Sequence, residues 1–302
     1  MDRKFAAILA AAACLSPLAA SAQNVAPASP HTVTGNFTLA TDYRFRGISQ
    51  TFKLPTVQGG IDYSHDSGFY LGTWASNVSG LQYTNGASLE MDFYGGFKFA
   101  AAKDWTFDLG VLHYNYPGAF WNNTAPSTGT TKFNNTEVYA AVGYKWASLK
   151  YSHTVTDLFG IRSEVFAPAV GGLAQNCGVD SSNTAYTPAN APYGCFDRSG
   201  SSKGSGYLDF TANVPLSDKA TLVAHVGRQT VKNYGRLTYS DWKLGINYDL
   251  GSSWILGGAY VDTNAKESFY RFANAVPAGG VTPENVKDVS NGTVVVSISK
   301  SF

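Results

Sequence analysis

The chain lacks long apolar runs beyond its N-terminal segment. A helix that crosses a bilayer needs about 20 consecutive apolar residues, and no such run follows the first residues of the sequence. The sequence therefore excludes helical membrane spans in the rest of the chain. The composition instead favours strands. The chain has 18 Phe, 18 Tyr and 31 Gly but only two Met, and aromatic residues are common in strands.

Charge of either sign is also scarce. Only 14% of the 302 residues are charged, and 22 basic side chains nearly balance 21 acidic ones. A nearly neutral chain offers no general attraction for nucleic acid or for an anionic surface. We therefore expect no nucleic-acid partner.

The sequence lacks the familiar catalytic and metal-binding patterns. None of the three cysteines and five histidines has the spacing of metal ligands, and no G-x-S-x-G, H-E-x-x-H or phosphate-binding loop occurs. Ser152 and His153 are adjacent, but neighbouring residues of a strand point to opposite faces. We expect no enzyme activity, no metal and no cofactor.

The N-terminus has the pattern of a secretory signal peptide. Arg3 and Lys4 precede an apolar stretch from Phe5 to Leu18, and Ala20-Ser21-Ala22 forms a small-residue cleavage site. The stretch is too short to anchor the chain as a helix. We predict that residues 1–22 are cleaved and that residues 23–32 are a flexible lead-in.

Period-two alternation is the main signal in the remaining sequence. Between Val33 and Gly47 the odd positions are mostly apolar or aromatic, and the even positions are polar or charged. Successive side chains of a strand point to opposite faces, so one face suits lipid and the other suits water. Twelve segments show this pattern: residues 33–47, 56–64, 69–78, 88–99, 105–116, 135–146, 148–157, 206–215, 220–229, 240–250, 253–264 and 292–302.

The links between these segments alternate between short and long. Links such as residues 65–68 and 216–219 are brief, whereas residues 117–134, 158–205 and 265–291 are long. Transmembrane β-barrels have short periplasmic turns and long outer loops. We therefore predict an all-β fold over residues 33–302, a transmembrane antiparallel barrel of about twelve strands with short periplasmic turns and long extracellular loops.

Three sets of residues are candidates for a role in this barrel. The terminal Phe302 ends the last alternating segment, as in the tag that barrel-assembly machinery recognises, and Cys177 and Cys195 are candidates for a disulfide in an oxidising compartment. Charged residues on the polar faces are candidates for lining the lumen, as a field that orients polar solutes or as paired charges in a polar interior. They are Asp42, Arg44, Arg46, Asp62, Glu90, Asp92, Lys145, Asp209, Asp241 and Lys243.

Several stretches resemble the proteobacterial TorF family of porin-like proteins. They include TDYRFRGISQT at residues 41–51, LEMDFYGGFK at 89–98, HYNYPG at 113–118 and DWKLGINYDL at 241–250. The resemblance runs in order through nearly the whole mature chain. It implies an integral barrel of the bacterial outer membrane, surrounded by lipid and passing solutes.

Three functions remain open on these grounds. The first is a passive channel for small polar solutes, and the second is a structural or surface-interaction barrel with a blocked lumen. The third is an outer-membrane lipase. Twelve strands lie between the eight of barrels filled by side chains and the 16–18 of water-filled porins, so the strand number is compatible with a pore or a plug.

Overall fold

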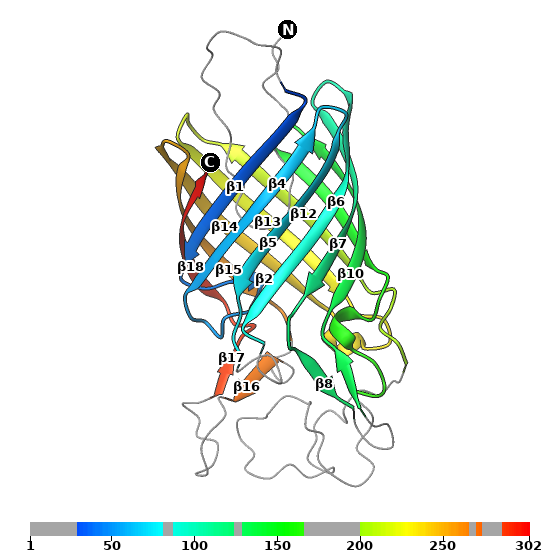
Figure 1. Ribbon diagram of the computed structural model, residues 1–302. Helices are drawn as coiled ribbons and strands as arrows, with labels where there is room; N and C mark the ends of the chain where they lie inside the picture. The colour runs from blue at the N-terminus through cyan, green and yellow to red at the C-terminus, as the bar shows by residue number, and fades with distance from the viewer. Residues whose placement is uncertain (1–28, 81–86, 124–128, 166–199, 266–269, 274–285) are drawn as a thin grey trace.

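A closed antiparallel β-barrel forms the body of the protein (Figure 1). The computed structural model describes residues 29–80, 87–123, 129–165, 200–265, 270–273 and 286–302. Twelve strands make the barrel, as the alternation predicts. They are β1 (His31–Ala40), β4 (Thr56–His65), β5 (Phe69–Asn77), β6 (Leu89–Ala102), β7 (Trp105–Asn115), β10 (Asn135–Tyr144), β11 (Ala147–Thr154), β12 (Gly206–Pro215), β13 (Ala220–Thr230), β14 (Tyr239–Gly251), β15 (Trp254–Thr263) and β18 (Thr293–Ser301).

The barrel closes where the last strand pairs with the first. Strand β18 lies antiparallel to β1, from Asn36 opposite Ser301 to Ala40 opposite Ser297. The Phe302 amide then donates to the Gly35 carbonyl at 3.0 Å. A Cβ on Gly35 would lie 2.4 Å from the Phe302 ring, so a larger residue there would displace this ring. Closure leaves no unpaired strand edge, which is the condition for a sheet in lipid.

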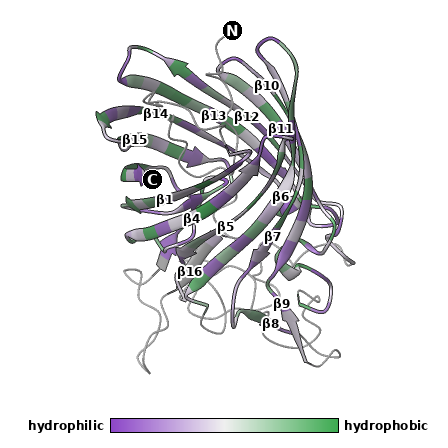
Figure 2. Cartoon of the chain, turned by 45° about the horizontal axis from the view of Figure 1, so that its top comes forward, coloured by the Kyte–Doolittle hydropathy of each residue, from purple (hydrophilic) through white to green (hydrophobic). Residues whose placement is uncertain are grey.

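The outer surface of the barrel is apolar because alternate side chains point outward. In β14, Trp242, Leu244 and Ile246 are exposed, whereas the adjacent Asp241 is buried. Figure 2 shows the same change of hydropathy along many strands. The described residues include no helix that is long and apolar enough to cross a membrane.

Connections at the two ends of the barrel differ in length. The five links of two to four residues lie at the end where β1 begins and β18 ends, which we call the turn end (Figure 1). The longer links lie at the opposite end, which we call the loop end. This segregation confirms the predicted arrangement of short turns and long loops.

Short strands and 3-10 turns lie at the loop end. They are the strands β2 (Arg44–Phe45), β3 (Ile48–Ser49), β8 (Phe120–Asn122), β9 (Thr130–Lys132), β16 (Arg271–Ala273) and β17 (Val286–Asp288), and the 3-10 turns η1 (Leu158–Gly160) and η2 (Gly235–Leu237). The predicted signal peptide and both candidate disulfide cysteines lie outside the described residues.

The first strand is shorter than predicted. The alternation suggested a strand from Val33 to Gly47, but β1 ends at Ala40. Arg46 and Gly47 have φ angles of 47° and 79°. Two consecutive left-handed residues make the tight turn of a β-hairpin, which joins β2 to β3. The chain therefore folds back before it can extend the barrel wall.

Candidate functional site

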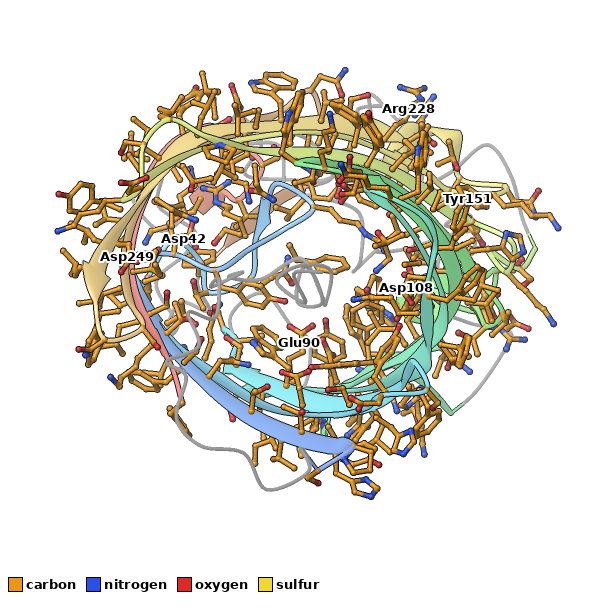
Figure 3. All side chains as sticks on the ribbon, turned by 90° about the horizontal axis from the view of Figure 1, so that it is seen from above. Asp42, Glu90, Asp108, Tyr151, Arg228 and Asp249 are labelled. Atoms are coloured by element: carbon orange, nitrogen blue, oxygen red, sulfur yellow. The ribbon has the colours of Figure 1, made fainter. Side chains whose placement is uncertain are left out.

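The connection between β1 and β4 folds into the barrel instead of standing above it. We call residues 41–55 the inward segment. In Figure 3 this light-blue segment crosses part of the ring, and Asp42 lies within the ring. The candidate functional site is the lumen at the loop end together with this segment.

Asp42 organises the base of the inward segment. Its carboxylate accepts hydrogen bonds from Ser49 Oγ at 2.6 Å and Thr51 Oγ1 at 2.9 Å, and from Arg44 Nε at 2.6 Å. Arg44 also donates to the Val289 carbonyl at 3.2 Å. These contacts hold the hairpin against the residues that precede β18.

Arg46 attaches the tip of the hairpin to the opposite wall. Its guanidinium donates to Glu137 Oε2 on β10 at 2.7 Å and to Gln229 Oε1 on β13 at 2.6 Å. It also lies over the Tyr207 ring of β12, 4.2 Å from the ring centre. The side chains of Arg46 and Glu137 are 7% and 2% exposed, so removal of either partner would leave a buried charge.

Gly47 brings the hairpin turn into direct contact with the wall. A Cβ at this position would lie 2.4 Å from Thr263 Cγ2 and 2.7 Å from Asp241 Cβ. These two neighbours belong to β15 and β14. The inward segment therefore reaches across the lumen at the loop end.

Aromatic side chains fill the space between the inward segment and the near wall. The Tyr43 ring meets Trp74 of β5 edge-on at 5.3 Å, and the Phe45 ring meets Tyr114 of β7 at 5.4 Å. Phe159 from η1 packs against Phe45 at 5.8 Å. Edge-to-face pairs of this kind add to the burial energy of the rings.

Phe159 connects this aromatic cluster to the rim. Its backbone adopts φ 47°, which non-glycine residues seldom do, and its carbonyl accepts a hydrogen bond from Trp121 Nε1 at 2.7 Å. Beside it, buried Leu158, Val165, Val231 and Tyr234 form a small apolar core. Burial raises the pKa of Tyr234 to about 12.

An exposed ion pair lies on the same rim. Arg162 donates from Nε and Nη2 to the two carboxylate oxygens of Glu164, at 2.7 and 2.8 Å. These hydrogen bonds lower the pKa of Glu164 to about 2. The pair is solvent-exposed and contributes little to stability.

Below the inward segment, phenols and charges form linked pairs. Tyr70 donates to Asp108 at 2.6 Å and also contacts the Tyr139 hydroxyl. Lys98 Nζ lies 3.9 Å from Asp108 Oδ2. Lys150 Nζ lies over the Tyr139 ring, 4.0 Å from its centre. Such a network keeps the interior polar while it satisfies most of the groups that line it.

Histidine mediates between two acids on the other side of the lumen. His225 Nε2 lies 2.8 Å from Asp241, and His225 Nδ1 lies 3.5 Å from Asp209. The Tyr207 hydroxyl donates to Asp241 at 3.0 Å. These contacts connect the strands β12, β13 and β14 on the lumen side.

The charged residues predicted to line the lumen fall into three groups. Asp42, Arg44 and Arg46 lie in the inward segment and not on the face of a barrel strand. Lys145 is exposed in the turn between β10 and β11, where φ is 51°. A turn residue cannot line the lumen, so this prediction was wrong. The structure places Asp62, Glu90, Asp92, Asp209, Asp241 and Lys243 on the barrel strands β4, β6, β12 and β14.

Sequence reasoning missed several interior residues that the structure brings together. Glu137, Asp108 and Lys150 lie on polar faces of strands whose alternation is weak. A charged residue between two apolar neighbours would mark an inward position on a strand. The mark is faint at Glu137, because Val138 is apolar but Thr136 is not.

The structure separates the side chains of the adjacent Ser152 and His153. Ser152 is buried, whereas the neighbouring Tyr151 lies outside the ring in Figure 3. His153 packs against Tyr151, with ring centres 6.3 Å apart. Ser152 and His153 therefore point to opposite faces of β11. Within the described ranges, no group of three or more His, Cys, Asp or Glu side chains is arranged to hold a metal ion.

The closed barrel with an apolar exterior and a polar interior defines a transmembrane barrel of the outer-membrane type. The chain belongs to the family described as "Bacterial protein of unknown function (Gcw_chp)", whose model matches residues 24–302. No curated protein matches the sequence.

Solved structures with a similar fold include porins. The KdgM porin is 7% identical, with a TM-score of 0.46 over 89% of this chain and 99% of that one. The NanC porin is 8% identical, with a TM-score of 0.44 over 90% and 99%. The outer membrane phospholipase A of Escherichia coli is 12% identical, with a TM-score of 0.36 over 90% and 96%. At these values the likeness does not bear on what the lumen admits.

Proposed function

We propose that the protein is a passive diffusion channel of the bacterial outer membrane for small polar solutes. The observation that carries this proposal is the composition of the barrel interior. Buried charged and hydroxyl side chains line the interior, including Thr38, Asp108 and Asp209. A barrel with a solid interior would instead be filled by apolar side chains. A polar interior attracts water and polar solutes.

The inward segment would determine how large a solute passes. It attaches at its tip to β10 and β13 through Arg46, and it contacts β14 and β15 through Gly47. A channel narrowed in this way admits small solutes and excludes large ones. Export by the signal peptide, recognition of Phe302 by assembly machinery and an outward-facing loop end all belong to this proposal.

A liposome-swelling assay tests the channel with solutes of graded size. The refolded protein is placed in vesicles, which are then diluted into iso-osmotic glycine, arabinose, glucose or raffinose. We expect swelling with the smallest solutes and little with raffinose. Swelling with none of them, at a protein content shown to be folded by electrophoresis, would contradict the proposal.

The second candidate function is a surface-interaction barrel whose lumen is closed. The attachment of the inward segment to both walls is the observation that favours it. In that case no solute would pass through the native barrel, and passage would begin only after the segment is detached from Glu137. The two functions are therefore separated by comparing the native barrel with a variant that detaches the segment, such as Arg46→Ala.

A further inference from the structure

Two carboxylates in the lumen lack the partners that the other interior acids have. Glu90 is fully buried and Asp92 is 8% exposed. They occupy alternate positions of β6 and so point to the same, inner side; Glu90 is seen inside the ring in Figure 3. Glu90 Oε1 and Oε2 and Asp92 Oδ1 are buried without a hydrogen bond from the described residues.

Three of the cationic side chains in the lumen are paired with other acids. Arg44 pairs with Asp42, and Arg46 pairs with Glu137. His225 lies between Asp209 and Asp241. A buried unpaired carboxylate is destabilised by several kcal/mol unless a cation or a proton joins it. Within the described residues, no cation of the chain thus pairs with Glu90 or Asp92.

Aromatic rings frame the two acids. Asp92 lies opposite Trp74 of β5 on one side and opposite Tyr114 of β7 on the other. Tyr43 of the inward segment packs on Trp74, and the Tyr43 and Tyr116 hydroxyls lie near enough to Glu90 to interact with it. Trp and Tyr faces attract cations, so the frame reinforces the charge of the carboxylates.

The number of open acceptors indicates the kind of cation. A primary ammonium group has three N–H donors, and three carboxylate oxygens of Glu90 and Asp92 lack a donor. A metal ion is a poorer fit, because no group of three potential ligand side chains occurs in the described residues. The alkyl part of an amine would in turn lie against the aromatic frame.

We propose that Glu90 and Asp92, framed by Tyr43, Trp74 and Tyr114, form a binding site for the primary ammonium group of a small organic amine. This inference rests on the proposed channel function, because it names the class of solute that the channel favours. The amine donates its N–H groups to the two carboxylates, which lie beside the inward segment.

Binding of butylammonium to the refolded full-length barrel in detergent tests the site. Trp74 adjoins Asp92, so binding changes the tryptophan fluorescence, and isothermal titration gives an independent dissociation constant. We expect the Glu90→Gln/Asp92→Asn variant to bind at least about tenfold more weakly, because hydrogen bonds to neutral amides are weaker than those to charged carboxylates. Both substitutions preserve shape and remove buried charge, so the variant should fold.

Matched controls separate this site from general charge effects. Asp66→Asn removes an acid from an exposed turn and should leave binding unchanged. Butanol lacks the charge and should not bind. Tetramethylammonium lacks N–H donors, so equal affinity for it would overturn the assignment of the three open oxygens. Equal binding by the native barrel and the double variant would overturn the site altogether.

Conductance of the same preparations separates this inference from the proposed function. A conducting barrel that binds no butylammonium would refute the amine site and leave the channel intact. A barrel that binds the amine at Glu90 and Asp92 but never conducts would refute the channel and leave a binding site in a closed barrel.

Discussion

The guanidinium of Arg46 joins the inward segment to β10, β12 and β13 at once. Replacing Arg46 by alanine leaves Glu137 buried and unpaired, which destabilises the docked segment by about 3 kcal/mol, or roughly a hundredfold in the docking equilibrium. Hydrogen–deuterium exchange at the Ser49 and Gln50 amides, which donate within and beside the segment, measures this change.

Arg228→Ala is the matched control for that experiment. Arg228 lies outside the ring in Figure 3 and donates to Ser240 on the neighbouring strand. Its loss should leave exchange in the inward segment unchanged. Equally slow exchange in the native protein and in Arg46→Ala would show that Arg46 does not hold the segment.

A pair of glycines separates backbone strain from steric contact with the wall. Gly47 and Gly118 have φ angles of 79° and 82°, but only Gly47 has atoms within 4 Å of an added Cβ. Alanine at either position should lower the free energy of unfolding by about 1–2 kcal/mol through strain. Gly47→Ala should lose more, because the turn must also move away from Thr263.

Urea unfolding in lipid vesicles measures this difference. The contact with the wall is supported by a larger loss for Gly47→Ala than for Gly118→Ala. Equal losses in the two variants would mean that the turn does not press on β14 and β15.

At the scale of the strands, the outward face of β14 tests the position of the lipid. Leu244 is 58% exposed in the middle of this strand, and Leu216 is 56% exposed in a short turn at the turn end. Arginine near the bilayer midplane costs about 2–4 kcal/mol, and near the interface about 0–1 kcal/mol. We therefore expect Leu244→Arg to destabilise the folded barrel in vesicles far more than Leu216→Arg.

The free energy of unfolding in vesicles is again the measurement. The two leucines have nearly the same exposure, so a difference between them reports depth in the bilayer. Equal destabilisation would contradict a lipid-facing exterior at Leu244.

The strands were largely predictable from the sequence, because a barrel wall divides lipid from water at every second residue. In β14 the alternation from Trp242 to Leu250 predicted the strand to within a few residues. The same rule failed after Ala40, where alternation continues through Arg44 and Arg46 although the chain has left the wall. The Arg46–Gly47 pair was the available signal for a turn.

The contacts of the site could not be predicted in the same way. Which charges meet across the lumen depends on how the twelve strands are staggered and on where the inward segment docks. Arg46 and Glu137 are 91 residues apart in the sequence, and no local pattern links them. The sequence likewise cannot show that Glu90 and Asp92 lack an ion-pair partner, because this depends on where the cations lie in the fold.

At the scale of the whole molecule, closure and occupancy are separate properties. Pairing of β1 with β18 and the seat of Phe302 over Gly35 complete the wall. The inward segment then attaches to the inner wall at the loop end, and under the proposed function it would set which solutes pass.

Single-channel conductance in planar bilayers tests this account most directly. The refolded native barrel should give small, discrete steps, and Arg46→Ala should give larger steps because the segment no longer spans the lumen. The Arg228→Ala control should match the native protein. If folded barrels of the native protein and of Arg46→Ala both give no steps, the protein is not a channel.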